Sequence, residues 1–328
     1  MPRKFPLVIG HRGAPGYRPE HSRSSYELAF AMGVDAVEPD VVATSDGVLV
    51  IRHENEISGT TDVAQHPEFA DRKTAKSVDG ETLTGWFTED FTWAELATLR
   101  CKERVPQVRL SSASFDGTQP ILRLTDLLDL VREASSEQGR EIGVVLEVKH
   151  ATYFASIGLP LAPMIARDLR DAGWAHGELP LVIESFESTV LGELHEHGIA
   201  ASYVYLIDAS GRPFDLFTAQ GKRALSYKAT VTPAGLDGLV GKVDGISVSK
   251  QMLLERGNTI VADAHARGLM VFTWTCRPEN AYLSPEFRSG EGKTAYGDYE
   301  SEWRVIAETG VDGVFVDQPD LGVAFFRS

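Results

Sequence analysis

Short apolar runs bounded by turn residues alternate along this chain with segments whose apolar positions recur at helical spacing. Runs of the first kind predict buried strands, and segments of the second kind predict amphipathic helices. The predicted strands span 7–10, 35–41, 142–148, 181–185, 201–206, 245–248, 269–273 and 313–316. The predicted helices span 24–32, 125–134, 163–172, 189–197, 259–267 and 302–309.

A strand followed by a helix, repeated about eight times, is typical of a (β/α)₈ or TIM barrel. We therefore predict a single α/β barrel domain over residues 1–328. The alternative is an open, doubly wound sheet, but no glycine-rich nucleotide-binding motif follows the first predicted strand. Barrel enzymes carry their active sites at the carboxyl ends of the strands, so the residues after each apolar run are the candidates for chemistry.

The alternation stops over residues 54–119, which form a polar segment. Residues 93–102 within it have helical spacing, with Thr92 as the predicted N-cap. So long a departure inside a compact unit is usually functional, or packs as a small insertion. Because the segment directly follows His53, a candidate site residue, we expect this insertion to lie near the active site and to cover part of it.

Charge and cysteine content narrow the class of protein. The 328 residues are 43% hydrophobic and carry a formal net charge of −15, which argues against nucleic-acid binding. Cys101 and Cys276 are too few for a disulfide framework, and we expect free thiols. No apolar run reaches the length of a membrane span, and the first residues lack a signal-peptide core. A cytoplasmic location is therefore favoured, whereas a periplasmic or secreted one requires a signal that has been removed.

Two carboxylates and two histidines follow apolar runs near the N-terminus: Glu38, Asp40, His11 and His53. Glu38 and Asp40 are two residues apart on one predicted strand, so their side chains point to the same side. They repel each other unless a proton or a cation intervenes, and oxygen ligands suit Mg²⁺ or Ca²⁺. The alternative is a pair of solvated carboxylates at a strand end.

A tight turn is predicted to bring His53 back to these carboxylates. Asp46-Gly47 is a strong hairpin signal, and the apolar run 48–51 supplies the second arm. Folding the chain about this turn places Asp40 opposite His53. The second arm is then part of a hairpin, which leaves eight strands for the barrel.

Three cationic or acidic side chains extend this set. Glu147 and Lys149 face one way at the end of the 142–148 run, as a third carboxylate for a cation and a positive charge for an anionic oxygen. The alternative for this pair is a simple salt bridge. Arg12 can bind phosphate oxygens in a bidentate manner, and the neighbouring His11 is a natural acid–base group near neutral pH.

Several short motifs point to one family. They are His11-Arg12-Gly13-Ala14, Arg18-Pro19-Glu20, Val37-Glu38-Pro39-Asp40-Val41, Asp46-Gly47-Val48, His53-Glu54, Leu146-Glu147-Val148-Lys149, Ser185-Phe186, Phe272-Thr273-Trp274-Thr275 and Gly313-Val314-Phe315-Val316-Asp317. In these motifs the chain resembles the glycerophosphodiester phosphodiesterase family. The segment after His53 looks like the insertion of the family's periplasmic bacterial members.

The resemblance implies a TIM barrel of the phospholipase-C-like type that hydrolyses glycerophosphodiesters to glycerol 3-phosphate and an alcohol. It implies that Glu38, Asp40 and Glu147 hold one divalent cation, Ca²⁺ or Mg²⁺. It also implies that His11 and His53 are the acid–base pair.

By the same resemblance, Arg12 and Lys149 bind phosphate oxygens, and Phe186 and Trp274 wall the glycerol or leaving-group pocket. The implied partner is a small-molecule glycerophosphodiester. Its head group, the resident cation and the oligomeric state of the protein are left open by the sequence.

Among the departures from the family pattern, which include Pro39 and Glu54, two add candidate site residues. His21 stands in Pro19-Glu20-His21-Ser22 where the family usually has Asn, and it adds a third imidazole as an acid–base candidate. Glu184 before Ser185 is also unusual, and either contacts a polar or cationic head group or pairs with a nearby cation. The rival functions are a lysophospholipase-D-like or sphingomyelinase-D-like phosphodiesterase and, in another class, a non-catalytic barrel.

Overall fold

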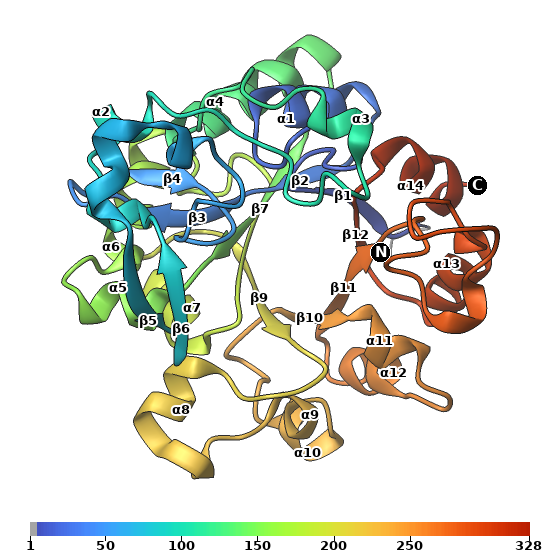
Figure 1. Ribbon diagram of the computed structural model, residues 1–328. Coiled ribbons are helices and arrows are strands. Elements are labelled where there is room, and N and C mark those ends of the chain that lie inside the picture. Colours follow the sequence, from blue (N-terminus) through green and yellow to red (C-terminus); the bar gives the residue numbers. More distant parts are fainter. Residues whose placement is uncertain (1–4) are drawn as a thin grey trace.

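Eight parallel strands close into a barrel in the computed structural model, which describes residues 5–328 (Figure 1). The barrel strands are β1 (Leu7–His11), β2 (Ala36–Glu38) with its continuation β3 (Asp40–Ala43), β7 (Gly143–Val148), β8 (Leu181–Ser185), β9 (Ser202–Ile207), β10 (Gly245–Ser249), β11 (Met270–Cys276) and β12 (Gly313–Val316). β1 pairs with β12 and with β2, and both β2 and β3 pair with β7, so the sheet has no open edge there. The predicted barrel is confirmed, and the open-sheet alternative is wrong.

Alternate residues of each barrel strand point inward and build the interior. A small apolar layer fills it, and its buried members are Ile9, Ala36, Val145, Val204, Phe272 and Phe315. Two residues further along β1, β2, β7 and β12, the inward positions are His11, Glu38, Glu147 and Asp317. The alternation that buries an apolar layer therefore places titratable side chains directly after it, at the carboxyl ends of the strands.

A ring of helices covers the outside of the barrel (Figure 1). The predicted helices are found as α1 (Arg23–Ala31), α4 (Leu124–Gln138), α6 (Leu161–Asp171), α7 (Ser188–Glu196), α12 (Ile260–His265) and α13 (Tyr299–Glu308). The pattern did not predict α5 (Ala151–Ser156), α8 (Phe214–Gln220), α9 (Tyr227–Thr230), α10 (Pro233–Asp237), α11 (Lys250–Leu254) and α14 (Pro319–Phe326). Most of these are one or two turns long, which is too short to show a helical period.

The early hairpin forms, but its predicted register is wrong by one residue. β3 pairs with β4 (Leu49–Ile51), and Val41 lies opposite Ile51. Asp40 therefore lies opposite Arg52 instead of His53, and Arg52 N donates to Asp40 O at 3.0 Å. The loop spans residues 45–47, with Gly47 in the left-handed region at φ 75°. This longer loop, in place of a two-residue turn, shifts the pairing.

The insertion contributes no strand to the barrel. It contains the hairpin β5 (Thr74–Val78) and β6 (Glu81–Gly85), the 3₁₀ turns η1 (Val63–Gln65), η2 (Pro67–Arg72) and η3 (Thr88–Asp90), and the helices α2 (Trp93–Leu96) and α3 (Leu110–Ala113). α2 is shorter than the predicted helix 93–102. Thr92 caps its start as predicted, together with Glu95. Arg100 ends it by donating to the carbonyls of Ala97, Thr98 and Leu99.

Two expectations from composition can be compared with the structure. Cys101 and Cys276 are buried free thiols, as predicted. Within residues 5–328, no helix combines the length and the apolar character needed to cross a bilayer.

Buried Arg52 fastens the insertion to the barrel. Arg52 directly follows β4 and is 1% exposed. The guanidinium donates to three carbonyl oxygens, those of Ile51 at 2.6 Å, Glu20 at 3.1 Å and Thr60 at 3.2 Å. These acceptors come from the hairpin, the loop before α1 and the insertion, so a single side chain holds together three segments that border the carboxyl end of the barrel.

Replacing Arg52 with Met should destabilise the protein, because a buried acceptor that loses its donor costs roughly 1–3 kcal/mol. We expect the free energy of unfolding, measured by urea denaturation, to fall by about 2–4 kcal/mol. Arg304→Met, on an exposed part of α13, is the control and should change it by less than about 0.5 kcal/mol. Equal stabilities of the two variants would show that the insertion docks without Arg52.

Candidate active site

A cleft of about 920 Å³ opens at the carboxyl ends of the barrel strands. Most of the predicted site residues line it: His11, Arg12, Glu38, His53, Glu147, Lys149, Glu184, Phe186 and Trp274. Asp40 and His21 are fully buried and do not line it. The barrel thus brings together side chains from β1, β2, β7, β8, β11 and the loops that follow them.

Three buried carboxylates, here called the acidic triad, meet in this cleft: Glu38, Glu147 and Glu184. One oxygen of each lies within 4.8 Å of the other two. Pairing of β7 with β8 places Glu147 directly opposite Glu184. Burial, reinforced by neighbouring carboxylates, raises the pKa of all three groups, to about 8 for Glu147. Such groups are unfavourable in the ionised form unless a positive charge lies among them.

The acidic triad has the donor chemistry of a site for a hard divalent cation. Glu184 Oε2 is buried and has no hydrogen-bond partner within residues 5–328, which is rare for a buried polar atom. Two oxygens bound to one Ca²⁺ lie at most about 5 Å apart, and the triad meets this limit. An all-oxygen donor set suits Mg²⁺ or Ca²⁺ better than softer metals.

Asp40, the third ligand expected from the sequence, occupies a different position from Glu184. Its Oδ2 lies 2.7 Å from His21 Nε2 and 3.5 Å from Arg12 Nε, and its Oδ1 lies 3.5 Å from Lys149 Nζ. Burial alone would raise the pKa of Asp40, but Lys149 and two imidazoles hold it well below its usual range. Asp40 is therefore ionised and connects the cations of the site. Its role as a metal ligand stays a prediction.

His21 does not reach the cleft. Its Nδ1 lies 2.8 Å from the Tyr26 hydroxyl and its Nε2 lies 2.7 Å from Asp40 Oδ2, so both ring nitrogens are engaged. The residue is 0% exposed. With both nitrogens engaged, the ring has no free nitrogen to offer a bound substrate, so an acid–base role for His21 stays a prediction. In this structure His21 positions Asp40.

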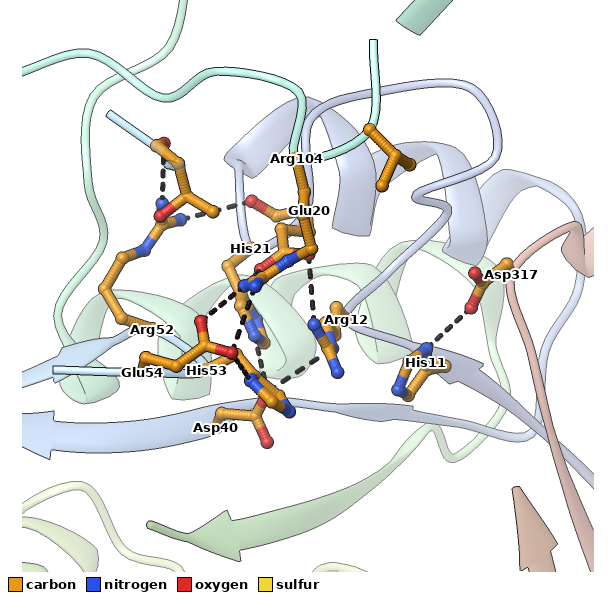
Figure 2. A network of polar contacts seen from close by, with 12 residues as sticks. His11, Arg12, Glu20, His21, Asp40, Arg52, His53, Glu54, Arg104 and Asp317 are labelled. Atoms are coloured by element: carbon orange, nitrogen blue, oxygen red, sulfur yellow. Dashed lines mark hydrogen bonds and ion pairs between the residues drawn. The ribbon is translucent and has the colours of Figure 1, made fainter. Parts of the chain in front are cut away.

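His11 is oriented by Asp317, which follows β12 (Figure 2). Its Nδ1 lies 2.6 Å from Asp317 Oδ1. Burial alone would raise the pKa of Asp317, but Arg277 and Arg109 hold it well below its usual range. The ionised carboxylate accepts from Nδ1–H, which leaves Nε2 as the basic nitrogen of the ring. Burial, and then Arg12, lowers the pKa of His11 to about 4, so its imidazole is neutral near pH 7.

His53 has a similar arrangement, with the Glu54 carboxylate at its Nδ1. Arg104 from the insertion binds Glu54 Oε2 at 2.7 Å and Glu20 Oε1 at 2.6 Å (Figure 2). Burial, and then Arg12, lowers the pKa of His53 to about 3. The insertion therefore fixes the ring of His53 through Glu54.

Arg12 and Lys149 form a positive edge beside the acidic triad. The backbone N–H of Arg12 donates to Glu38 Oε2 at 2.7 Å, and the side-chain Nζ of Lys149 lies 2.6 Å from Glu147 Oε1. The Arg12 backbone is left-handed, at φ 57°, a conformation that non-glycine residues rarely adopt and that clusters at functional sites. Two positively charged side chains beside the acidic triad suit an anionic ligand that would contact both a metal ion in the triad and the protein.

Aromatic side chains and the insertion border the other end of the cleft. The Phe186 ring packs edge-on against Trp274 at 5.6 Å and against Tyr227 at 6.1 Å between centroids. Asp79, at the tip of the β5–β6 hairpin, lines the same cleft and lies 2.6 Å from His150 Nδ1. The tip of the β5–β6 hairpin thus brings the insertion beside the candidate site.

Asp317 and Arg104 were not singled out from the sequence. Asp317 had a signal, since it continues the inward alternation of β12 after Phe315. Arg104 had none, because it lies 50 residues from Glu54 in a segment without periodicity. Only the folded insertion shows that Arg104 and Glu54 meet.

Comparison with known proteins decides which family this arrangement belongs to. A family model described as the glycerophosphoryl diester phosphodiesterase family matches residues 11–321. The chain belongs to this family. A glycerophosphodiester phosphodiesterase of Arabidopsis thaliana, GDPD6, is 30% identical over 95% of this chain and 83% of its own length. A glycerophosphodiester phosphodiesterase of Haemophilus influenzae is 25% identical over 98% of this chain and 90% of its own length.

Solved structures share the fold of this phosphodiesterase family member. A Silicibacter pomeroyi chain assigned to the same family has a TM-score of 0.68 at 23% identity, covering 99% of this chain and 95% of its own. An Oleispira antarctica phosphodiesterase in complex with the product sn-glycerol-3-phosphate has a TM-score of 0.64 at 20% identity, covering 99% and 98%. At these identities the likeness supports the barrel fold, and the resemblance seen in the motifs is confirmed by the family match.

Asp317→Asn should lower phosphodiester turnover at least ~10²-fold, because the amide no longer enforces the Nδ1–H tautomer of His11. KM should change little, since Asp317 holds the ring and does not bind substrate. Steady-state kinetics at constant pH would measure this, with Asp320→Asn, an exposed acid nearby, as the control. Equal turnover in the two variants would refute the orienting role.

Proposed function

We propose that the protein hydrolyses glycerophosphodiesters to glycerol 3-phosphate and an alcohol, using one divalent cation and the His11–His53 pair. Family membership makes it a phosphoric diester hydrolase. The observation that carries the finer proposal is the single cleft in which both oriented histidines, the acidic triad and the positive edge meet. The names of the Arabidopsis and Haemophilus relatives and the product bound to the Oleispira protein support the substrate class.

Glu38, Glu147 and Glu184 would hold the cation, as Mg²⁺ or Ca²⁺. Once bound, a divalent ion stabilises the negative charge that builds up on the phosphoryl oxygens. Lys149, 2.6 Å from Glu147, supplies positive charge at the same edge of the cleft.

Arg12 and Lys149 bind and orient the phosphate group. The Arg12 guanidinium has planar donors that match phosphate oxygens, and Glu20 and Asp40 hold it from behind through contacts of 3.1 Å and 3.5 Å. The side chain is 11% exposed, so it loses little conformational freedom when the ligand binds. The Asp40 carboxylate therefore contacts both Arg12 and Lys149, and its negative charge keeps the guanidinium and the ammonium group in place.

His11 and His53 transfer the protons. Each ring presents a basic Nε2, because its Nδ1 faces a carboxylate. One Nε2 takes the proton of the attacking free hydroxyl of the glycerol arm, while the other ring, in its protonated form, donates to the departing alcohol oxygen. The new P–O bond makes a cyclic phosphate, which water then opens to glycerol 3-phosphate with the roles of the two rings reversed. An anionic phosphodiester in the cleft favours protonation of a nearby ring, since negative charge raises its pKa. The pH profiles of the single variants assign the two roles.

The direct test is the release of glycerol 3-phosphate from glycerophosphoglycerol by the purified protein. We expect turnover with Mg²⁺ or Ca²⁺, loss of turnover in EDTA, and recovery when the ion is returned. Unchanged turnover in EDTA would contradict the role of the cation. No hydrolysis of any glycerophosphodiester would contradict the function, and faster cleavage of lysophosphatidylcholine would favour the lysophospholipase-D-like alternative.

His11→Ala and His53→Ala should each lower kcat at least ~10²-fold, because general acid–base steps typically contribute ~10²–10⁴-fold. Circular dichroism and thermal unfolding should show that the barrel survives both changes. His176→Ala, at an exposed position away from the cleft, is the control and should keep wild-type kcat. Wild-type kcat in both site variants would remove these histidines from the mechanism.

A further inference from the structure

The outer end of the cleft differs in chemistry from the inner end. Its aromatic members are Phe186, Phe214, Phe217 and Tyr227, and its acidic members are Asp79, Glu81, Glu187 and Asp208. Arg212 and His150 also line this end. His150 is already paired with Asp79, and Arg212 Nε donates to Ala224 O at 2.9 Å. The acidic groups outnumber the cations, so this end of the cleft is negative, whereas Arg12 and Lys149 make the phosphate end positive.

Glu187 is the buried carboxylate of this outer end, and it is 3% exposed. Its Oε2 accepts hydrogen bonds from the backbone N–H of Thr152, at 3.0 Å, and from the Thr152 hydroxyl. Within residues 5–328 its Oε1 has no hydrogen-bond partner, although the residue lines the cleft. Burial, reinforced by the charges of Asp79 and Asp215, raises the pKa of Glu187 to about 7. The free oxygen is therefore an open position for a donor or a positive charge.

Phe186 and Tyr227 connect this carboxylate to the phosphate end. Tyr227 donates its hydroxyl hydrogen to Phe186 O at 3.1 Å, which fixes one ring against the other. Lys149 Nζ lies 5.8 Å from the centroid of Phe186. A phosphate bound by Lys149 would therefore have the aromatic corner as its next neighbour, and Glu187, the residue after Phe186, lines the same cleft.

We propose that the outer end of the cleft selects diesters whose leaving alcohol carries an ammonium group. This inference rests on the proposed function. Glu187 supplies the counter-charge, and Phe186 and Tyr227 supply ring surfaces that attract a cation. A neutral polyol gains little from the rings, and an anionic head group is repelled by the carboxylates.

A pair of substrates with the same shape and different charge tests this selection. Glycerophosphocholine carries a trimethylammonium group, and glycerophospho-3,3-dimethylbutanol carries the neutral tert-butyl group in its place. We expect the wild-type kcat/KM to favour the choline diester by about 10-fold, the scale of a desolvated cation–π contact with a counter-charge. Glu187→Gln, which keeps the shape of the side chain, should reduce this ratio to about 1–3.

Three further variants separate selection from folding. Tyr227→Leu should lower the ratio and Tyr227→Phe should retain it, because only the first removes the ring. Glu193→Gln, on the exposed side of α7, should leave the ratio and the basal activity unchanged. Choline should inhibit the wild-type protein more strongly than 3,3-dimethylbutan-1-ol. Inhibition by the free alcohol measures binding alone, so it does not depend on how readily the alcohol departs from phosphorus.

The outcomes are distinct. An equal preference for both diesters in the wild-type protein would overturn the inference while leaving the proposed function intact. A fall in kcat/KM shared equally by both substrates in Glu187→Gln would also overturn it, because Glu187 would then bind the glycerol arm or support the fold. Failure to hydrolyse either diester while glycerophosphoglycerol is still cleaved would also overturn the inference, whereas failure to hydrolyse all three would remove the proposed function.

Discussion

Three carboxylates that meet within 4.8 Å in a buried cleft cannot all be ionised unless positive charge lies among them. The rest of the site follows from this constraint. Lys149 and Arg12 stand beside the acidic triad, yet Glu184 Oε2 still has no hydrogen-bond partner in the part of the chain that the structure describes. A divalent cation would satisfy the remaining charge. The same cluster of charges then provides an anion-binding edge, and two carboxylates outside the triad fix the tautomers of His11 and His53.

Much of this arrangement could be predicted from the period of the barrel strands. Apolar runs gave the strands, and the inward alternation carries His11, Glu38 and Glu147 from the apolar layer to the cleft. The same phase predicts Glu184, two residues after inward Val182, as a neighbour of Glu147. Its place in the acidic triad was missed because the resemblance drew attention to Asp40. Where the period is regular, position alone identifies the residues that meet.

The remaining features depend on contacts without a local signal. A three-residue loop replaced the expected two-residue turn and moved Asp40 opposite Arg52, although His53 still reaches the cleft. The sequence made His21 an acid–base candidate, because it shows an imidazole near the site but neither the burial of the ring nor its two hydrogen-bond partners. Both are properties of the fold. Arg104 joins Glu54 and Glu20 from a distant, aperiodic segment, so no pattern could reveal that the insertion orients a histidine.

Cation binding to the metal-free protein tests the central claim most directly. Isothermal titration calorimetry with Mg²⁺ and Ca²⁺ should show one site per chain in the wild-type protein. Glu184→Gln should weaken that site at least ~10-fold, whereas Asp40→Asn should weaken it less and Glu193→Gln should leave it unchanged. No binding by the wild-type protein would contradict the account. So would wild-type affinity in Glu184→Gln together with loss of binding in Asp40→Asn, because Asp40 would then be the third ligand.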